Sequence, residues 1–209
     1  MKPRIFIFDF DGTIADTYRH SVEIFNQLAE EFHYKPILPE EVAKLKNKSS
    51  LELIRYFRIP ILKLPAIIAK GKKKFEKRVS VIEPISGIKE CLTQLKNSGT
   101  QLGILSSNSR ELIIGFLNNH RMDMFDFVHT TSKVWSKNIS LQKLIFKNRF
   151  RKEQIVYVGD EVRDILAAQK LGIKIAAVTW GYNSAQNLQQ YNPDFLIHKP
   201  EELTALAGL

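Results

Sequence analysis

The sequence predicts an α/β protein, with a doubly wound (Rossmann-like) parallel sheet core and a small all-helical cap domain inserted after strand 1. Short apolar runs recur along the chain, and several are continuous rather than alternating, which is typical of parallel strands buried on both faces. From residue 85 onward, helical patterns separate these runs, so crossover connections are expected. Residues 17–84 break this alternation and contain helical patterns only.

The expected core elements follow one another in chain order. The expected strands are Arg4–Phe8, Gln101–Ser106, Phe127–Thr130, Ile155–Gly159, Lys174–Thr179 and Phe195–Ile197. The expected helices are Ile88–Asn97, Arg110–Asn119, Ser140–Lys147 and Arg163–Leu171. Two of these helices run into a glycine, Gly99 or Gly172, which is a common signal for a helix C-terminus.

The cap is expected to consist of helices that prolines separate. The expected segments are Tyr18–Phe32, a stretch opened by Pro39, Leu51–Phe57 and Pro65–Arg78. Residues 1–16 and 85–209 then form the α/β core domain, and residues 17–84 form the cap. The hinges are expected near residues 16–18 and 82–86.

Composition restricts the class of protein. A chain of 209 residues, 44% hydrophobic and 25% charged, is long enough for one sizeable core plus an accessory domain and is not typical of disorder. No apolar run approaches the roughly 20 residues of a membrane-spanning helix, and the apolar stretch near the N-terminus is too short for a signal peptide. The single cysteine, Cys91, is expected to be a buried small hydrophobe. This cysteine usage predicts a cytoplasmic protein.

The net charge of +9 is concentrated in the predicted cap, which contains fourteen Lys and Arg, eight Glu and no Asp. These basic helices could hold nucleic acid or phosphorylated nucleic-acid ends, or they could simply present solvated faces. Their basic residues include Lys44, Lys46, Lys48, Arg55, Arg58 and several lysines in residues 70–74. Few aromatic residues are interleaved with them, which disfavours a single-strand binding platform.

Asp9 and Asp11 directly follow the first predicted strand, at the strand end where open α/β sheets bind ligands. Two carboxylates so close together repel each other unless a cation lies between them, and Mg²⁺ prefers carboxylate oxygens. One carboxylate can attack phosphorus while the other transfers the proton. The alternative is a helix N-cap, which needs one aspartate and not two. The pair therefore predicts a metal-assisted phosphoryl-transfer site.

A second acidic pair, Asp160 and Asp164, follows the strand that ends at Gly159. Asp160 is expected to point into the same crevice, and Asp164 to begin a helix. A capping box is the alternative interpretation. The presence of Asp9 and Asp11 favours a shared metal site.

Ser106, Ser107 and Asn108 follow another strand and precede a helix, so a hydroxyl and free backbone N–H groups can hold an anion there. Lys137 lies upstream of the Ile155 strand and is a further candidate site residue. A lone lysine is more often a solvated surface group, so this assignment depends on the rest of the set.

Four ordered segments, IFIFDFDGTIADT (5–17), ILSSN (104–108), Lys137 and VGDEVRD (158–164), resemble the motifs of the haloacid dehalogenase superfamily. The resemblance is greatest to its phosphoglycolate phosphatase-like hydrolases with a helical cap. It implies that Asp9 is the nucleophile that forms an aspartyl-phosphate. It also implies that Asp11 is the general acid and base, with its backbone carbonyl on Mg²⁺. Ser106 would hold the phosphate, and Lys137 would neutralise both nucleophile and phosphoryl group.

The resemblance also makes Asp160 and Asp164 the acidic part of the metal site. Two departures leave alternatives open. Many relatives have a proline after the lysine of the third motif, whereas asparagine follows Lys137, so Lys133 competes for this role. Glu161 could replace Asp164. The expected metal ligands are Asp9, Asp11, Asp160 and Asp164.

The predicted function is Mg²⁺-dependent hydrolysis of a small phosphorylated metabolite similar to phosphoglycolate. The second aspartate, Asp11, argues against dehalogenation. A phosphotransferase or sugar-phosphate mutase would use the same intermediate, but water is the default acceptor in a site that admits it. The cap is expected to close over the substrate, with Lys46 or Arg55 contacting its non-reacting part.

Overall fold

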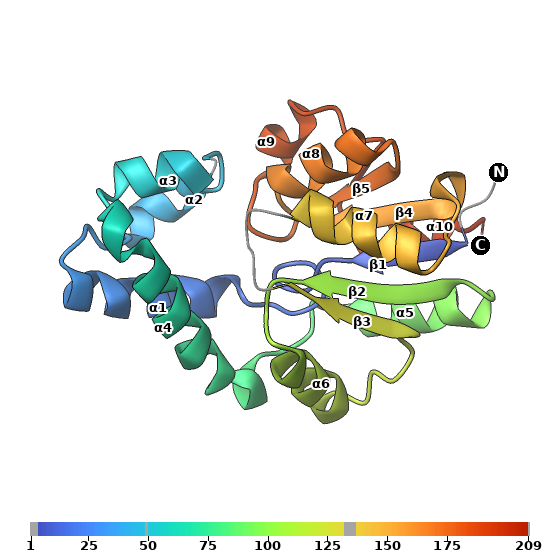
Figure 1. The fold of residues 1–209 in the computed structure, drawn as a ribbon, viewed down its shortest axis with the longest axis horizontal. Coiled ribbons are helices and arrows are strands. Elements are labelled where there is room, and N and C mark those ends of the chain that lie inside the picture. Colours follow the sequence, from blue (N-terminus) through green and yellow to red (C-terminus); the bar gives the residue numbers. More distant parts are fainter. Residues whose placement is uncertain (1–3, 49, 132–136, 209) are drawn as a thin grey trace.

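The computed structural model describes residues 4–48, 50–131 and 137–208, and they form an α/β fold with a parallel sheet. Its strand order is β3-β2-β1-β4-β5-β6, so the chain leaves the sheet centre in both directions (Figure 1). The strands are β1 (Ile5–Phe8), β2 (Gln101–Ser106), β3 (Phe127–Thr130), β4 (Ile155–Gly159), β5 (Lys174–Val178) and β6 (Phe195–Ile197). The predicted doubly wound fold is confirmed.

The two central strands, β1 and β4, are continuous apolar runs because helices cover both faces of the sheet. In β1, Phe6 and Phe8 pack into one hydrophobic cluster, whereas Ile5 and Ile7 pack into a second cluster on the opposite face. Side chains alternate between faces along a strand, so a strand buried on both sides needs an apolar residue at every position. This is the physical basis of the pattern seen in the sequence.

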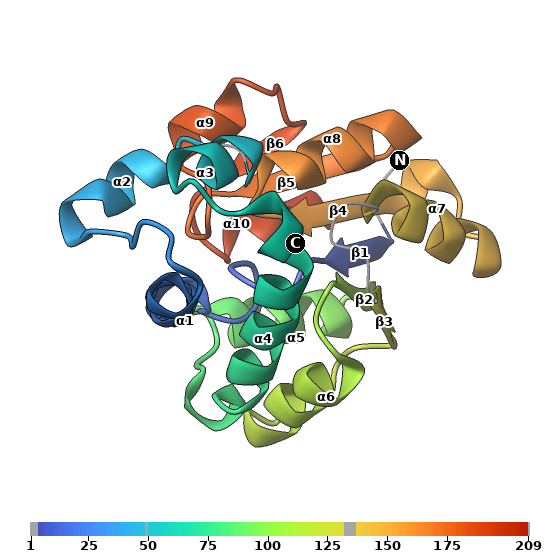
Figure 2. The ribbon, with the colours of Figure 1, turned by 60° about the vertical axis from the view of Figure 1, so that its left-hand side comes forward.

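In the part of the chain that the structure describes, six helices cover the sheet, three on each face. One face packs against α5 (Ile88–Asn97), α6 (Arg110–Asn119) and α10 (Glu202–Leu206). The other face packs against α7 (Lys137–Lys147), α8 (Val162–Leu171) and α9 (Ala185–Gln189). Figure 2 shows α5 and α6 on one side of the strands and α7 and α8 on the other.

The segment between β1 and α5 forms its own helical layer beside the sheet (Figure 1). Its elements are α1 (Tyr18–Phe32), η1 (Pro39–Glu41), α2 (Val42–Leu45), α3 (Ser50–Tyr56), η2 (Ile61–Lys63), α4 (Leu64–Glu76) and η3 (Val79–Val81). A third hydrophobic cluster, whose fully buried members come from residues 24–67, holds these helices together. A separate cluster supports the division into core and cap, which we keep as a proposal.

Hydrogen bonds join this helical layer to the sheet domain at several places. The Lys46 carbonyl accepts hydrogen bonds from the Ser184 amide (3.0 Å) and the Asn183 side chain (3.1 Å), while its ammonium donates to the Gly181 carbonyl (2.7 Å). On α4, the Lys72 ammonium donates to the Ser107 carbonyl at 2.7 Å. The helices are therefore held over the carboxyl ends of the strands.

Most predicted elements agree with the structure to within one or two residues, with three differences. Helix α7 begins at Lys137, three residues before the predicted start, so Lys137 lies in the first turn of a helix. The short helices α9 and α10 were not predicted, because five residues carry too little periodicity.

Among the described residues, no helix is long and apolar enough to cross a membrane.

Candidate active site

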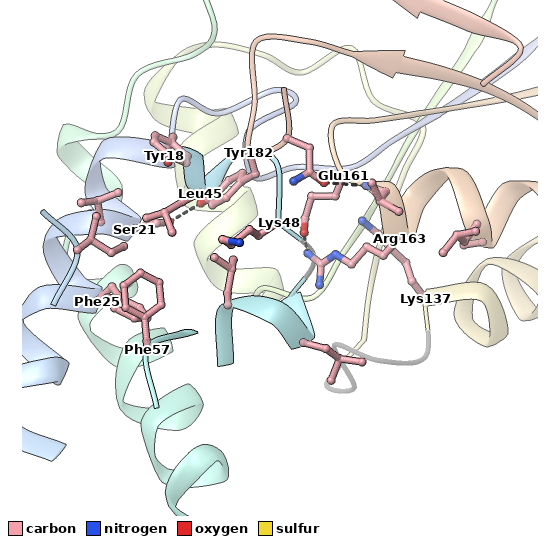
Figure 3. A pocket seen from close by; sticks show the side chains of 18 of the residues that line it. Tyr18, Ser21, Phe25, Leu45, Lys48, Phe57, Lys137, Glu161, Arg163 and Tyr182 are labelled. Atoms are coloured by element: carbon pink, nitrogen blue, oxygen red, sulfur yellow. Dashed lines mark hydrogen bonds and ion pairs between the residues drawn. The ribbon is translucent and has the colours of Figure 1, made fainter. Parts of the chain in front are cut away.

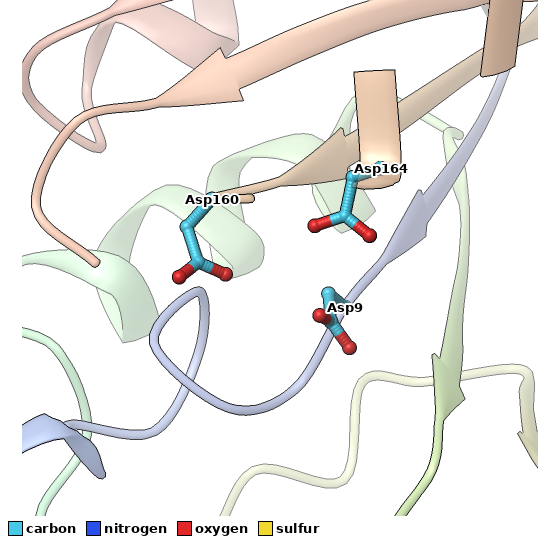
Figure 4. Close-up of side chains that lie close together, drawn as sticks. All are labelled: Asp9, Asp160 and Asp164. Carbon is cyan, nitrogen blue, oxygen red and sulfur yellow. The ribbon is translucent and has the colours of Figure 1, made fainter. Parts of the chain in front are cut away.

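Three buried carboxylates, from Asp9, Asp160 and Asp164, meet at the carboxyl ends of β1 and β4 (Figure 4). One oxygen from each lies within 4.8 Å of the others. Phe8 and Val158 are partners in the register of these neighbouring strands, so the residues that follow them reach the same point. The convergence of Asp9 with Asp160 therefore follows directly from the parallel pairing of β1 with β4.

Asp164 joins this cluster because the start of α8 folds back over Gly159. A Cβ atom on Gly159 would lie 2.5 Å from an Asp164 carboxylate oxygen, so only glycine leaves room for this approach. The same carboxylate accepts a hydrogen bond from the Glu161 amide at 3.1 Å. The capping box that was the alternative interpretation is therefore present, and Asp164 lies in the acidic cluster at the same time.

Gly12 makes the turn that follows Asp11. Its φ is +72°, a left-handed conformation that favours glycine, and a Cβ there would lie 2.5 Å from an Asp160 oxygen. Thr13, which is fully buried, donates a hydrogen bond to the other Asp160 oxygen at 2.8 Å. The turn therefore both shapes and holds the Asp160 carboxylate.

Lys137 bridges two members of the cluster. Its ammonium lies 2.5 Å from both an Asp9 oxygen and an Asp164 oxygen, and the side chain is buried. Burial acts to lower the pKa of Lys137, but the charges of Asp164 and then Asp9 outweigh it and hold the pKa well above its ordinary value. Lys137 is thus a fixed positive charge beside Asp9. Lys133, the alternative, lies outside the described residues.

Asp11 lies beside the cluster rather than in it. One carboxylate oxygen accepts a hydrogen bond from the Asn108 side chain at 2.7 Å, and the other is buried without a hydrogen-bond partner among the described residues. Burial, and then the neighbouring charge of Asp9, raise the pKa of Asp11 to about 7. A carboxyl group in this range can both hold and release a proton near neutral pH. The expected contact of its backbone carbonyl with a metal stays a prediction.

The predicted anion-binding residues form the loop after β2. The Ser106 hydroxyl is fully buried and accepts a hydrogen bond from the Asn108 amide at 3.0 Å. Ser107 contributes its carbonyl to the Lys72 contact described above. Ser109 caps α6 through its hydroxyl, so the loop leads directly into a helix N-terminus. Asn108 thus connects the two groups, because its backbone amide donates a hydrogen bond to Ser106 and its side chain donates one to Asp11.

Glu161 and Arg163 lie at the edge of the cluster. The two side chains form an ion pair, and Glu161 is not among the three clustered carboxylates. Burial raises the pKa of Glu161, and the charge of Arg163 partly opposes this rise. Of the two candidates for the second acidic partner, the geometry favours Asp164.

Sequence reasoning missed two contacts to Asp160. The Tyr182 amide donates to its carboxylate at 2.7 Å, and Thr13 donates to the other oxygen. Thr13 stands within the DFDGT motif, so its position could have been suspected from the sequence. Tyr182 lies in the loop after β5, where no spacing rule indicates that it folds back.

The donor set fits a divalent cation. Burial, followed by the charges of Glu161, Asp9 and Asp164, raises the pKa of Asp160 well above its ordinary value. One lysine cannot balance the three clustered carboxylates, and a bound dication would relieve their repulsion. Oxygen donors of this kind suit Mg²⁺, and the residues present therefore fit the predicted metal.

The family follows from comparison with known proteins. The family model described as "Haloacid dehalogenase-like hydrolase" matches residues 6–178, which include every predicted site residue. The chain belongs to this family. This confirms the resemblance drawn from the four motifs.

Known relatives are similar in sequence over nearly the whole chain. Phosphoglycolate phosphatase of Synechococcus elongatus is 33% identical over 94% of this chain and 93% of its own. Pyrophosphatase PpaX of Bacillus cereus is 26% identical over 97% of this chain and 95% of its own. A solved structure from Bacteroides fragilis, assigned to the haloacid dehalogenase-like hydrolases, has 27% identity and a TM-score of 0.83, covering 97% of this chain and all of its own. The prediction of an enzyme of the phosphatase class is confirmed.

Proposed function

We propose that this protein hydrolyses a small phosphate monoester in a Mg²⁺-dependent reaction through an aspartyl-phosphate on Asp9. One observation carries this proposal: Asp9 contacts Lys137 on one side and adjoins the carboxylates of Asp160 and Asp164 on the other. A carboxylate in this position has positive charge beside it and a second acid, Asp11, two residues away. These are the groups that phosphoryl transfer needs.

The reaction has two steps. In the first, an Asp9 carboxylate oxygen attacks phosphorus, the bond from phosphorus to the ester oxygen breaks, and Asp11 gives its proton to the leaving alkoxide. In the second, water gives a proton to Asp11 and attacks the phosphorus of the aspartyl-phosphate. The acyl–phosphate bond breaks, which releases phosphate and restores Asp9.

Other side chains hold the phosphoryl oxygens and the nucleophile. Lys137 neutralises charge on Asp9 and on the phosphoryl group, and its burial fixes its position. The Ser106 hydroxyl and the Asn108 amide group provide further hydrogen bonds at the loop before α6. Asn108 also orients Asp11 through the hydrogen bond that their side chains share.

Asp9, Asp160 and Asp164 would hold the Mg²⁺ ion, together with the Asp11 carbonyl. When bound, the ion supplies positive charge that offsets the phosphate and carboxylate charges. The role of Thr13 and Tyr182 is to keep the Asp160 carboxylate in its orientation through their hydrogen bonds.

Phosphoglycolate is the first substrate to test, because the 33% identical relative carries that name. Pyrophosphate is the second, because the 26% identical relatives are pyrophosphatases. The proposed partner is thus a small phosphorylated molecule, with water as the acceptor. The cytoplasmic location stays a prediction from cysteine usage.

The test is an assay of phosphate release from a panel of monoesters and pyrophosphate, with Mg²⁺ or with EDTA. We expect Mg²⁺-dependent turnover, and we expect Asp9→Asn to reduce kcat at least about 1,000-fold, because the amide is not a nucleophile. Asp123→Asn is the matched control, since Asp123 is exposed and distant in sequence from the motifs.

Two results would contradict the proposal. Retention of activity in Asp9→Asn would exclude Asp9 as the nucleophile. Alcohol release without an equal amount of free phosphate would indicate transfer to another acceptor, as in a mutase or phosphotransferase.

A further inference from the structure

A cavity of about 490 Å³ lies between the cap helices and α8, next to the acidic cluster (Figure 3). Three of its lining residues also touch that cluster, and one of these contacts is the hydrogen bond that the Glu161 amide donates to the Asp164 carboxylate. The Lys137 ammonium contacts Asp9, and the Tyr182 amide contacts Asp160. The cavity therefore begins where the phosphoryl-transfer site ends, and the leaving group of a phosphate held beside Asp9 can extend into it.

The walls of this cavity are largely apolar. Its aliphatic and aromatic lining residues come from both the cap and the core, and they include Phe25, Leu45, Leu51, Phe57, Val162 and Leu166. Such a lining favours an apolar ligand, because burying apolar surface is worth about 25 cal/mol per Å². A glycolate group carries a carboxylate and only two carbons, so it would leave these walls in contact with water.

Aromatic rings form two of the cavity's surfaces. Phe25 and Phe57 pack edge to face with ring centroids 4.8 Å apart, and Tyr18 and Tyr182 pack in the same way at 5.3 Å. Phe57 is buried and holds the Phe25 ring in place, whereas Tyr18, Phe25 and Tyr182 are half-buried and offer rigid edges and faces to a further ring. Figure 3 shows Phe25 and Phe57 on the cap side, opposite Glu161 and Arg163 on the core side.

The charged lining residues are mostly basic and suit a phosphate ester. The lining includes four basic residues, Lys48, Lys137, Arg163 and Lys170, of which Lys137 contacts Asp9 and Asp164 and Arg163 pairs with the lining acid Glu161. Their positive charge attracts a phosphate dianion to the cavity. A volume of about 490 Å³ lies in the range of about 300–1,000 Å³ that holds drug-sized ligands. The occupant is thus larger than glycolate and combines an anionic head with an apolar body.

We propose that the cavity is the leaving-group site for a phosphate monoester of an apolar, ring-bearing alcohol, which this enzyme prefers over phosphoglycolate. This inference rests on the proposed function for its catalytic meaning, since it names the substrate class of the same site. It assigns specificity to the aromatic pairs and to leucines at the cavity mouth. Leu51 and Leu166, each about half exposed, form part of that mouth.

Binding of phosphonates tests the cavity without any turnover. A phosphonate cannot be hydrolysed at its carbon–phosphorus bond, so calorimetry with Mg²⁺ present reports affinity alone. We expect benzylphosphonate to bind at least ten-fold more tightly than methylphosphonate. Equal affinities, or no measurable binding of benzylphosphonate, would overturn the inference.

Two leucine variants test whether the cavity causes this difference in affinity. Leu51→Asp places a charge at the cavity, and we expect it to remove most of the advantage of benzylphosphonate. Leu62→Asp is the matched control, because Leu62 is also a cap leucine, is 98% exposed and does not line the cavity. It should keep the ten-fold difference. An equal loss in both variants, or no loss in Leu51→Asp, would contradict the assignment.

Kinetics then separate this inference from the proposed function. Benzyl phosphate and ethyl phosphate have similarly poor leaving groups, so a higher kcat/KM for benzyl phosphate reflects binding of the ring. We expect a ratio above ten, with phosphoglycolate also below benzyl phosphate. If phosphoglycolate is the better substrate, the inference fails and the proposed function stands. If no ester is hydrolysed but benzylphosphonate binds selectively, the proposed function fails and the cavity assignment stands.

Discussion

Lys137 illustrates how a single residue acquires its role from its surroundings. On the sequence it is one lysine among several, yet in the structure it is buried between Asp9 and Asp164 at 2.5 Å from each. Removing one partner of a buried ion pair typically costs about 3–5 kcal/mol, because a charge is left without compensation. Lys137 is therefore expected to matter for stability as well as for catalysis.

Substitution of Lys137 by methionine tests this role. We expect Lys137→Met to lower kcat at least about 100-fold and to lower the free energy of unfolding without Mg²⁺ by about 3 kcal/mol. Urea unfolding measures the second effect, and added Mg²⁺ should recover part of it. Lys143→Met on the exposed side of α7 is the control and should change neither quantity. Unchanged stability and activity in Lys137→Met would favour Lys133 as the lysine of the phosphate site.

At the scale of helices and loops, several lysines of the cap form contacts that hold neighbouring elements together. The Lys46 ammonium donates to the Gly181 carbonyl and lies 4.4 Å from the centre of the Tyr18 ring, so it fastens α2 to the loop after β5. The sequence raised Lys46 and Arg55 as substrate contacts, but neither lines the cavity. Other basic residues of the cap form ion pairs with acidic residues of the cap, as Lys35 does with Glu41. These contacts favour a structural use of the cap charge.

Loss of the Lys46 contact should loosen the cap. A hydrogen bond from a charged donor contributes about 1 kcal/mol when partly exposed, so we expect Lys46→Ala to raise KM about five-fold. Faster proteolytic cleavage near residues 82–86 should accompany the rise. Lys44→Ala, two residues earlier in α2 and exposed, should behave as the wild type. Identical KM and cleavage rates in both variants would show that the contact does not hold the cap.

At the scale of the whole molecule, the acidic cluster joins segments that are far apart in the chain. Asp9 follows β1, whereas Asp160 and Asp164 come from the end of β4 and the start of α8. These three carboxylates exist as a group only in the folded state. A cation that binds them therefore stabilises the native protein against unfolding.

Metal-dependent thermal stability follows from this arrangement. At a Mg²⁺ concentration of 100 times Kd, the stabilisation is about 2.7 kcal/mol, which for a chain of this length raises Tm by roughly 5–10 °C. Differential scanning calorimetry with Mg²⁺ and with EDTA measures the shift. Asp160→Asn should abolish most of it, and Asp123→Asn should retain it. A Tm that does not respond to Mg²⁺ would argue against this metal.

The fold was predictable because its signals are local. Continuous apolar runs such as Ile5–Phe8 report burial on both faces, and helical periodicity reports the layers between them. The positions of Asp9 and Asp160 were predictable for a related reason, since parallel neighbouring strands end at one edge of the sheet. The short helix α9 escaped prediction because its five residues pack through Leu188 rather than through a repeating pattern.

The sequence by itself determined the α/β class, the strand-end carboxylates and the family, because residue spacing and residue type carry that information. Only the tertiary structure decided that Lys137 reaches Asp9, that Tyr182 supports Asp160, and that cap and core enclose an apolar cavity. Each of these depends on how segments distant in the chain dock against one another. Docking is set by the packing of whole surfaces, which no local pattern records.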